Sequence, residues 1–73
     1  MPDWPRLSGA EIIKALERLG FVQMRQRGSH VVMRNGSCGC VVPLHREVKT
    51  GTLAGLVRQA GLDAEVFLGA VKK

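Results

Sequence analysis

Hydrophobic residues recur at helical spacing in the first third of the chain. A capping box opens this segment, because the Ser8 hydroxyl can accept from the amide of Glu11 while the Glu11 carboxylate accepts from the amide of Ser8. Apolar side chains then form one stripe at Ile12, Ile13, Leu16 and Leu19. Gly20 follows and supplies a left-handed stop. The pattern predicts a helix over residues 8–19.

Apolar and polar residues alternate in the middle of the chain, as they do in half-buried strands. The alternation predicts strands over residues 21–27, 30–34 and 40–44, separated by turns rich in Gly, Ser and Asn. Pro43 indicates that the third strand ends at an edge or at a break in the ladder. One face of the first two strands is expected to be buried, through Val22, Met24, Val31 and Met33. The other face, or its rim, is expected to carry Arg25, Arg27, His30 and Arg34.

A second helical stripe follows a loop at residues 45–49. Thr50 is the expected N-cap of a helix that Gly61 ends, with core-spaced residues Leu53, Leu56, Val57 and Ala60. Asp63 is expected to cap a short last helix. The predicted fold is therefore α+β in the order α-β-β-β-α-α, a three-stranded antiparallel sheet with helices on one face. The buried face of the first two strands should pack against Leu16, Leu53 and Leu56.

The length and composition are those of a small globular domain. With 73 residues, of which 45% are hydrophobic, we expect one domain over 1–73, with a loosely ordered segment over 1–6. No run approaches the ~20 apolar residues that span a bilayer. The N-terminal residues contain no apolar signal-peptide region. We therefore expect a cytoplasmic protein that has no membrane partner.

The positive charge is concentrated in the middle of the chain. The net charge is +5, and residues 21–49 contribute +4 of it, from five basic residues and one acidic residue. A concentrated basic region is typical of a surface that binds a polyanion. Solubility alone is the alternative explanation of a basic surface.

His30 is the leading candidate for chemistry. It follows a Gly-Ser turn and lies on the face expected to be basic. Histidine titrates near neutrality, so it can take and return a proton at physiological pH. In RNA cleavage it would remove the proton of the 2′-hydroxyl, which then attacks the adjacent phosphate, while nearby Arg and Lys stabilise the developing charge. A polar strand residue with no catalytic role is the alternative.

A phosphate site is predicted where the second long helix begins. Free amides at a helix N-terminus, preceded by Lys49 and unobstructed at Gly51, suit an anion. Simple capping by Thr50 is the alternative. His45, in the preceding loop, is a second candidate acid or base and ranks behind His30.

Two cysteines lie close together, at Cys38 and Cys40. Such a pair makes a poor structural disulfide, which suits a reducing compartment. A zinc site using both cysteines with His30 and His45 is an open alternative, although the spacing does not match the common structural zinc patterns. A tight turn with two small side chains is the simpler interpretation.

RNA is favoured over DNA, and backbone contacts over base stacking. Neither predicted long helix concentrates basic residues, as a helix that reads duplex DNA would. Aromatic residues are few, with Phe21 and Phe67 expected in the core and Trp4 near a terminus. A platform for stacked bases is therefore not expected.

An ordered series of short motifs between residue 7 and about residue 70 resembles the HicA family, small toxins of bacterial and archaeal toxin–antitoxin pairs. The motifs are Ser8-Gly-Ala-Glu11, Leu19-Gly-Phe21, Arg27-Gly-Ser-His30, Val42-Pro-Leu-His45, Gly51-Thr-Leu53 and Gln59-Ala-Gly61. Each motif is weak by itself, but their order and spacing together are specific.

The resemblance implies an mRNA interferase on a double-stranded-RNA-binding-domain-like fold, working without a metal or other cofactor and without a small-molecule substrate. Its essential histidine would be His30, and its partners would be mRNA and a HicB-type antitoxin that covers the active site. A non-catalytic RNA-binding module of the same fold stays open as the alternative. The residues expected to bind RNA are Arg25, Arg27, Ser29, Lys49, Thr50 and Gly51.

Overall fold

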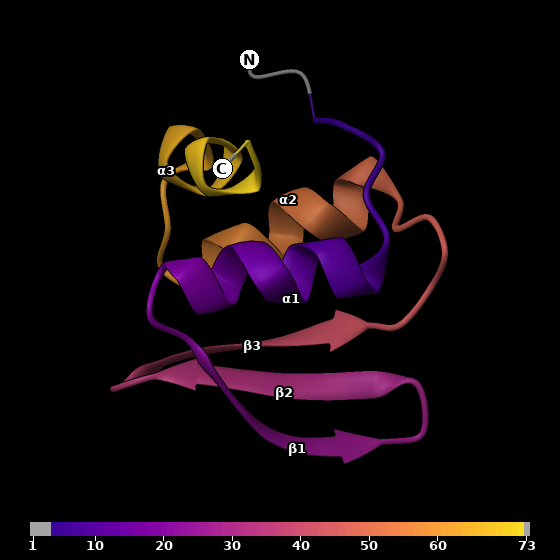
Figure 1. The fold of residues 1–73 in the computed structure, drawn as a ribbon, viewed down its shortest axis with the longest axis vertical. Helices are drawn as coiled ribbons and strands as arrows, with labels where there is room; N and C mark the ends of the chain where they lie inside the picture. The colour runs from indigo at the N-terminus through magenta and orange to yellow at the C-terminus, as the bar shows by residue number, and fades with distance from the viewer. Residues whose placement is uncertain (1–3, 73) are drawn as a thin grey trace.

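Three helices lie on one face of a three-stranded antiparallel sheet in the computed structural model, which describes residues 4–72 (Figure 1). The strands are β1 (Val22–Arg27), β2 (His30–Asn35) and β3 (Cys38–Pro43), in the spatial order β1-β2-β3. The helices are α1 (Gly9–Arg18), α2 (Thr50–Gln59) and α3 (Ala64–Val71). The predicted α+β fold, of the double-stranded-RNA-binding-domain type, is confirmed.

The first helix forms where its capping residues predict. The amide of Glu11 donates to the Ser8 hydroxyl at 3.2 Å, and the amide of Ser8 donates to the Glu11 carboxylate at 3.0 Å. The Ser8 amide, which donates to the carboxylate, and next the Ser8 hydroxyl hold the pKa of Glu11 below its usual value. Gly20 has the left-handed φ of 96° that ends the helix.

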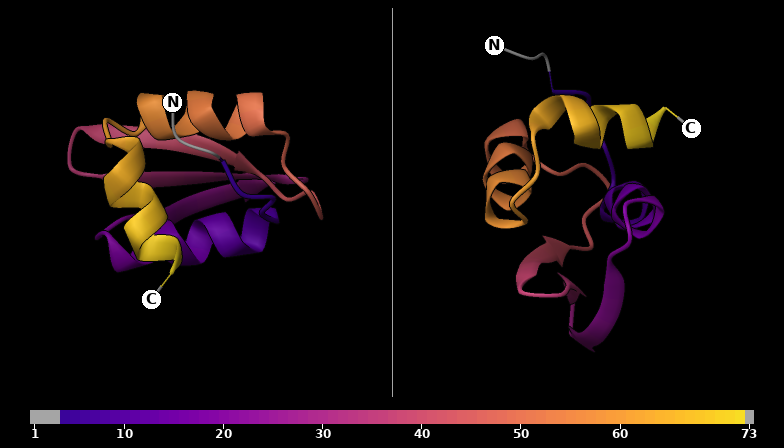
Figure 2. Two further views of the ribbon diagram at one scale, coloured as in Figure 1. Left: turned by 90° about the horizontal axis from the view of Figure 1, so that it is seen from above. Right: turned by 90° about the vertical axis from the view of Figure 1, so that its left-hand side faces the viewer.

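The core lies between the sheet, α1 and α2, and Phe67 and Ala70 of α3 complete it. At the centre of the sheet, Val31 pairs with Val42 and Met33 pairs with Cys40, and all four side chains are buried. α1 and α2 lie side by side over this surface, and α3 lies on their far side from the sheet (Figure 2). Arg18 fastens α1 to α3 by donating to the carbonyl of Ala70 at 2.9 Å.

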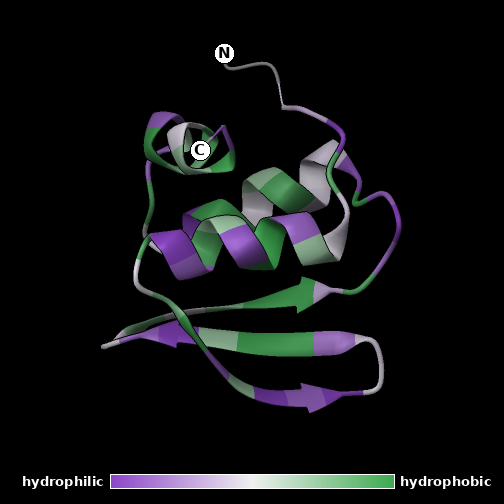
Figure 3. Cartoon of the chain, viewed as in Figure 1, coloured by the Kyte–Doolittle hydropathy of each residue, from purple (hydrophilic) through white to green (hydrophobic). Residues whose placement is uncertain are grey.

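β1 is more exposed than the sequence predicts. Val22 and Met24 are each 59% exposed, so the prediction that they are buried is wrong, while Val31 and Met33 are buried as predicted. β1 is an edge strand and lies farthest from the helices, which cover β2 and β3 instead (Figure 1). Coloured by hydropathy, β1 is mostly hydrophilic, whereas the middle of β2 and the end of β3 are hydrophobic (Figure 3).

The strand register places the predicted basic residues on the sheet face away from the helices, here called the open face. Directly paired residues share a face, and Arg27 pairs with His30 while Arg25 pairs with Val32. A register shift between Gln23 and Arg25 inserts an extra residue in β1, which puts Val22 opposite Arg34. The open face includes Val22, Arg25, Arg27, His30, Val32, Arg34 and Val41.

Smaller differences between the predicted and the observed fold concern the residues at which helices and strands begin. The N-cap of α2 is Lys49, not Thr50, and it makes no side-chain capping bond. β3 begins at Cys38, two residues before the predicted start, because the Asn35–Cys38 pair closes the hairpin. The expectation for residues 1–6 falls partly outside the described residues. Among residues 4–72, no helix is long and apolar enough to cross a membrane.

Candidate active site

A hollow of about 440 Å³ lies at one end of the sheet, where β2 begins, β3 ends and the chain turns toward α2. Both histidines of the sequence contribute to it, together with a lysine, a threonine and a carboxylate. The residues that line it are His30, Pro43, His45, Glu47, Val48, Lys49 and Thr52. Candidate groups for proton transfer and for phosphate binding therefore meet in one place.

His30 reaches the hollow from the first position of β2. The Gly28–Ser29 turn, in which Gly28 has a φ of 55°, brings β2 back along β1 and pairs His30 with Arg27. On its other side His30 pairs with Pro43, the last residue of β3. The side chain is exposed, as proton exchange with a substrate requires.

His45 reaches the same hollow from the loop between β3 and α2, and backbone contacts hold this loop in place. The carbonyl of His45 accepts from the amide of Gly9 at 2.9 Å. The amide of Val48 donates to the carbonyl of Leu7 at 2.7 Å, and the Val48 side chain is buried. The start of α1 therefore fixes the path of the loop.

Gly9 allows this close approach because it has no side chain. A Cβ atom at Gly9 would overlap the carbonyl oxygen of Pro43 and lie 2.9 Å from the Cα of Leu44, both of them backbone atoms. Glycine at this position is thus a condition for the loop, and hence His45, to lie where it does.

The N-terminus of α2 borders the hollow. First-turn amides of a helix have no partner within the helix, and Lys49 at the N-cap offers no side-chain acceptor to them. A neighbouring hollow of about 670 Å³ shares Glu47, Val48, Lys49 and Thr52 with the first and adds Arg6, Thr50 and Gly51. Amides, helix dipole and a lysine together make this end of α2 attractive to an anion.

The structure brings most of the predicted site residues together. Lys49 lies in the hollow with His30, Thr50 and Gly51 lie in the adjoining one, and Ser29 is in the turn before His30. Arg27 is directly across from His30, whereas Arg25 is farther along the open face, opposite Val32.

Four lining residues, Pro43, Glu47, Val48 and Thr52, were missed by the sequence analysis. Glu47 also forms an ion pair with Arg6 at 3.9 Å, which contributes little because both side chains are largely exposed. Their proximity to His30 follows from the path of the loop, which no residue pattern encodes. The Pro-Leu-His motif, in which Pro43 ends β3 two residues before His45, was the one available signal.

The cysteines lie at the other end of β3 from the histidines. Cys38 begins β3 opposite Asn35, and Pro43 ends it opposite His30, roughly 16 Å away at the usual rise per residue. Cys40 faces the core, and burial raises the pKa of its thiol to about 11. The four ligands of the zinc alternative therefore do not converge, and residues 4–72 contain no other such cluster.

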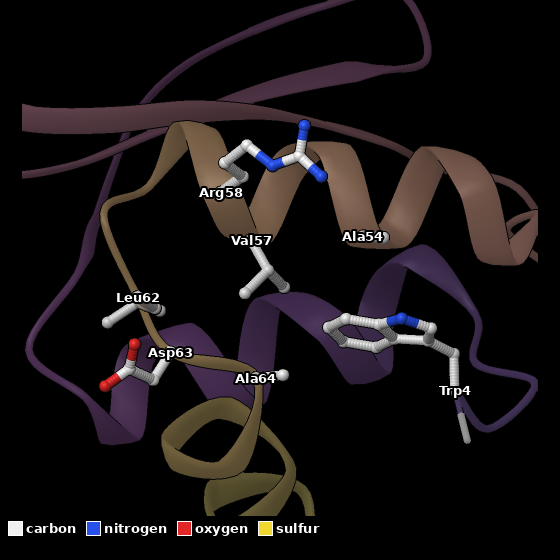
Figure 4. A pocket seen from close by; sticks show the side chains of 7 residues that line it. All are labelled: Trp4, Ala54, Val57, Arg58, Leu62, Asp63 and Ala64. Atoms are coloured by element: carbon white, nitrogen blue, oxygen red, sulfur yellow. The ribbon is translucent and has the colours of Figure 1, made fainter. Parts of the chain in front are cut away.

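A further hollow, of about 410 Å³, lies between α2 and α3 with Trp4 at its side (Figure 4). Its lining is mainly apolar, and the Asp63 carboxylate points away from the Trp4 ring. Trp4 packs on buried Phe67 with ring centroids 6.4 Å apart, and Phe21 is buried as predicted. The aromatic residues thus belong to the core and its margin, away from the open face.

The chain is thus a small basic α+β domain with a double-stranded-RNA-binding-domain-like fold, in which two histidines lie beside the N-terminus of α2. The family model described as HicA toxin of bacterial toxin–antitoxin systems matches residues 9–62, more than half of the 73 residues. The chain therefore belongs to the HicA toxin family and is a toxin of a toxin–antitoxin pair. A search of curated proteins found no match to it.

Proposed function

We propose that this toxin is an endoribonuclease that cleaves mRNA in the cytoplasm with His30 as its general base. The position of His30 supports this proposal. His30 is exposed at the start of β2, in a hollow that it shares with Lys49 and that the N-terminus of α2 borders. A proton acceptor and a phosphate-binding element are thus adjacent, as strand scission requires.

His30 takes the proton of a ribose 2′-hydroxyl, and the 2′-oxygen attacks the adjacent phosphorus. Lys49 and the amides of Thr50 and Gly51 bind the non-bridging oxygens, where negative charge develops in the transition state. The products are a 2′,3′-cyclic phosphate and a 5′-hydroxyl. No metal or cofactor takes part, so cleavage continues when divalent ions are chelated.

The remaining predicted residues hold the RNA strand beside the hollow. Arg27 is paired with His30 on the open face, and Arg25 continues the basic surface away from it. The exposed turn residue Ser29 offers a hydroxyl next to the base. These contacts address phosphate and ribose, which position a strand without specifying its sequence.

A HicB-type antitoxin is the proposed protein partner, and it inhibits by covering the hollow. Membership of a toxin–antitoxin family supports the existence of such a partner. The test is to co-purify this toxin with the protein encoded by the neighbouring reading frame and to measure cleavage with and without it.

A non-catalytic RNA-binding module is the second candidate. The exposed arginines of the open face favour it, because they would bind RNA with no chemistry at all. Replacement of His30 separates the two candidates, since binding depends on the arginines and cleavage on the histidine.

The decisive experiment compares wild type, His30→Ala and an exposed control in α3, Glu65→Ala, on one end-labelled RNA. A positioned base typically contributes ~10²–10⁴-fold, so His30→Ala should lose about that much cleavage. Its unfolding free energy should change by less than about 0.5 kcal/mol, because the side chain is exposed. RNA with a 2′-deoxy nucleotide at the cut site should resist. Full cleavage by folded His30→Ala would disprove the assignment.

A further inference from the structure

We propose that His45 is the general acid of the same reaction, protonating the 5′-oxygen that leaves; this inference rests on the proposed function. His45 and His30 line one hollow although they come from different elements, the β3–α2 loop and the start of β2. Lys49 and Thr52 line the same hollow, so both histidines lie beside a lysine and the first turn of α2.

The backbones that carry the two histidines are tied to each other. Leu44, immediately before His45, donates its amide to the carbonyl of Ser29, immediately before His30, at 2.6 Å. The carbonyl of His45 is held by the amide of Gly9 at 2.9 Å. The relative position of the two backbone segments is therefore set by the turn before β2 and by the start of α1 rather than by a free loop.

The chemistry of strand scission calls for two groups. As the bond from the 2′-oxygen to phosphorus forms and the bond from phosphorus to the 5′-oxygen breaks, these two oxygens lie roughly in line on opposite sides of phosphorus. A base that receives the 2′ proton cannot also reach the leaving oxygen in that step. His30 takes the 2′ proton, and His45, as the imidazolium, gives its proton to the 5′-oxygen.

The step balances without any co-reactant. One proton is gained by His30 and one is lost by His45, and the electron pair of the broken bond stays on the 5′-oxygen, which becomes a hydroxyl. The charged groups around His45 are Glu47 and Lys49 in the hollow and Arg46 beside it in the chain. Exchange with water then returns both histidines to their starting forms.

Replacing the leaving 5′-oxygen by sulfur tests the role of the general acid separately from that of the general base. The wild-type cut site is first mapped, and an RNA oligomer is then made in which sulfur replaces the bridging 5′-oxygen at that site. A thiolate leaves far more readily than an alkoxide because its conjugate acid has a much lower pKa, so this substrate needs little help from an acid. Single-turnover rates are measured on both oligomers for wild type, His45→Ala, His45→Gln and His30→Ala.

His45→Ala and His45→Gln should lose ~10²–10⁴-fold on the oxygen substrate and recover most of that loss on the sulfur substrate. His30→Ala should be slow on both, because the 2′-hydroxyl still needs a base. Arg46→Ala is the matched control; it changes an exposed residue of the same loop that does not line the hollow, and it should keep the wild-type rate ratio between the two substrates.

An equal loss on both substrates, or no loss, in folded His45 variants would overturn the acid assignment and leave the proposed function standing. Failure of the wild type to cleave any RNA in the mapping step, or full activity of His30→Ala on the oxygen substrate, would instead overturn the proposed function. Melting curves verify folding, which depends on the backbone carbonyl of His45 rather than on its exposed side chain.

Discussion

Gly9 is the residue whose missing Cβ atom matters most directly to both the fold and the candidate site. Gly9→Ala should destabilise the protein by roughly 1–3 kcal/mol, since the new methyl overlaps backbone atoms of Pro43 and Leu44 that cannot move aside as a side chain would. Cleavage should fall as well, because the displaced loop carries His45. Urea denaturation and the RNA assay measure the two effects.

Gly55→Ala is the matched control for that change. Gly55 lies within α2 and is exposed, and apart from its chain neighbours and the nearby helix backbone no described atom lies within 4 Å of a Cβ built there. The substitution should stabilise the helix by roughly 0.5–1 kcal/mol. If Gly9→Ala and Gly55→Ala changed the unfolding free energy and the cleavage rate equally, the close contact between Gly9 and the loop would contribute to neither.

Cys40 should make stability depend on pH in the alkaline range. Burial raises the pKa of its thiol from 9.0 to about 11, so the unfolded chain releases this proton at lower pH than the folded chain does. The stability linked to this thiol is therefore complete below pH 9.0 and is lost as pH rises toward about 11. Denaturation curves across this range should show a steeper fall for wild type than for Cys40→Ala. Cys38→Ala, which removes an exposed thiol, should keep the wild-type steepness.

At the scale of elements, two methionines on neighbouring strands should differ sharply in their contribution to stability. Met33 in β2 is fully buried, so Met33→Ala should cost about 2–5 kcal/mol. Met24 in β1 is 59% exposed, so Met24→Ala should change stability by no more than about 0.5 kcal/mol. If urea denaturation gave similar losses of unfolding free energy for Met33→Ala and Met24→Ala, β1 would be covered in solution.

The sequence predicted the helices and strands well because their signals are local. The Ser8–Glu11 capping box, the apolar stripe of α1 and the Gly20 stop all act within a few residues, and α1 begins and ends as they indicate. The burial of β1 was mispredicted because alternation reports which residues share a face, not whether a helix covers it. The extra residue at Met24 also reversed the alternation, which a regular period cannot reveal.

Single residues of the candidate site could be predicted from the sequence, but their arrangement around one hollow could not. His30 and Lys49 could be chosen from their residue types and from the turn and helix start beside them. That both lie in one hollow with His45 depends on the close approach at Gly9 and on the bond between Leu44 and Ser29. These are contacts between distant parts of the chain, so only the folded structure could supply them.

The fold concentrates positive charge in the sheet and the loop that leads to α2. Residues 21–49, which carry +4 of the net +5, form the sheet and the loop to α2, so the open face and the hollow share this positive field. RNA binding should therefore release counterions mainly there. In a His30→Ala background, which should bind without cutting, adding Arg25→Ala, Arg27→Ala or Lys49→Ala should each weaken binding and reduce the slope of log affinity against log salt by about 0.7.

Arg58→Ala tests whether RNA binding depends on where a positive charge lies or only on the total charge of the protein. It removes the same single charge as Arg27→Ala, but Arg58 lines the hollow beside Trp4, between α2 and α3. If RNA follows the open face to the N-terminus of α2, Arg58→Ala should keep the parent slope at every salt concentration titrated, because no phosphate is paired there. Equal changes for Arg58→Ala and Arg27→Ala would show that binding follows net charge, and the RNA path proposed over the open face would then be wrong.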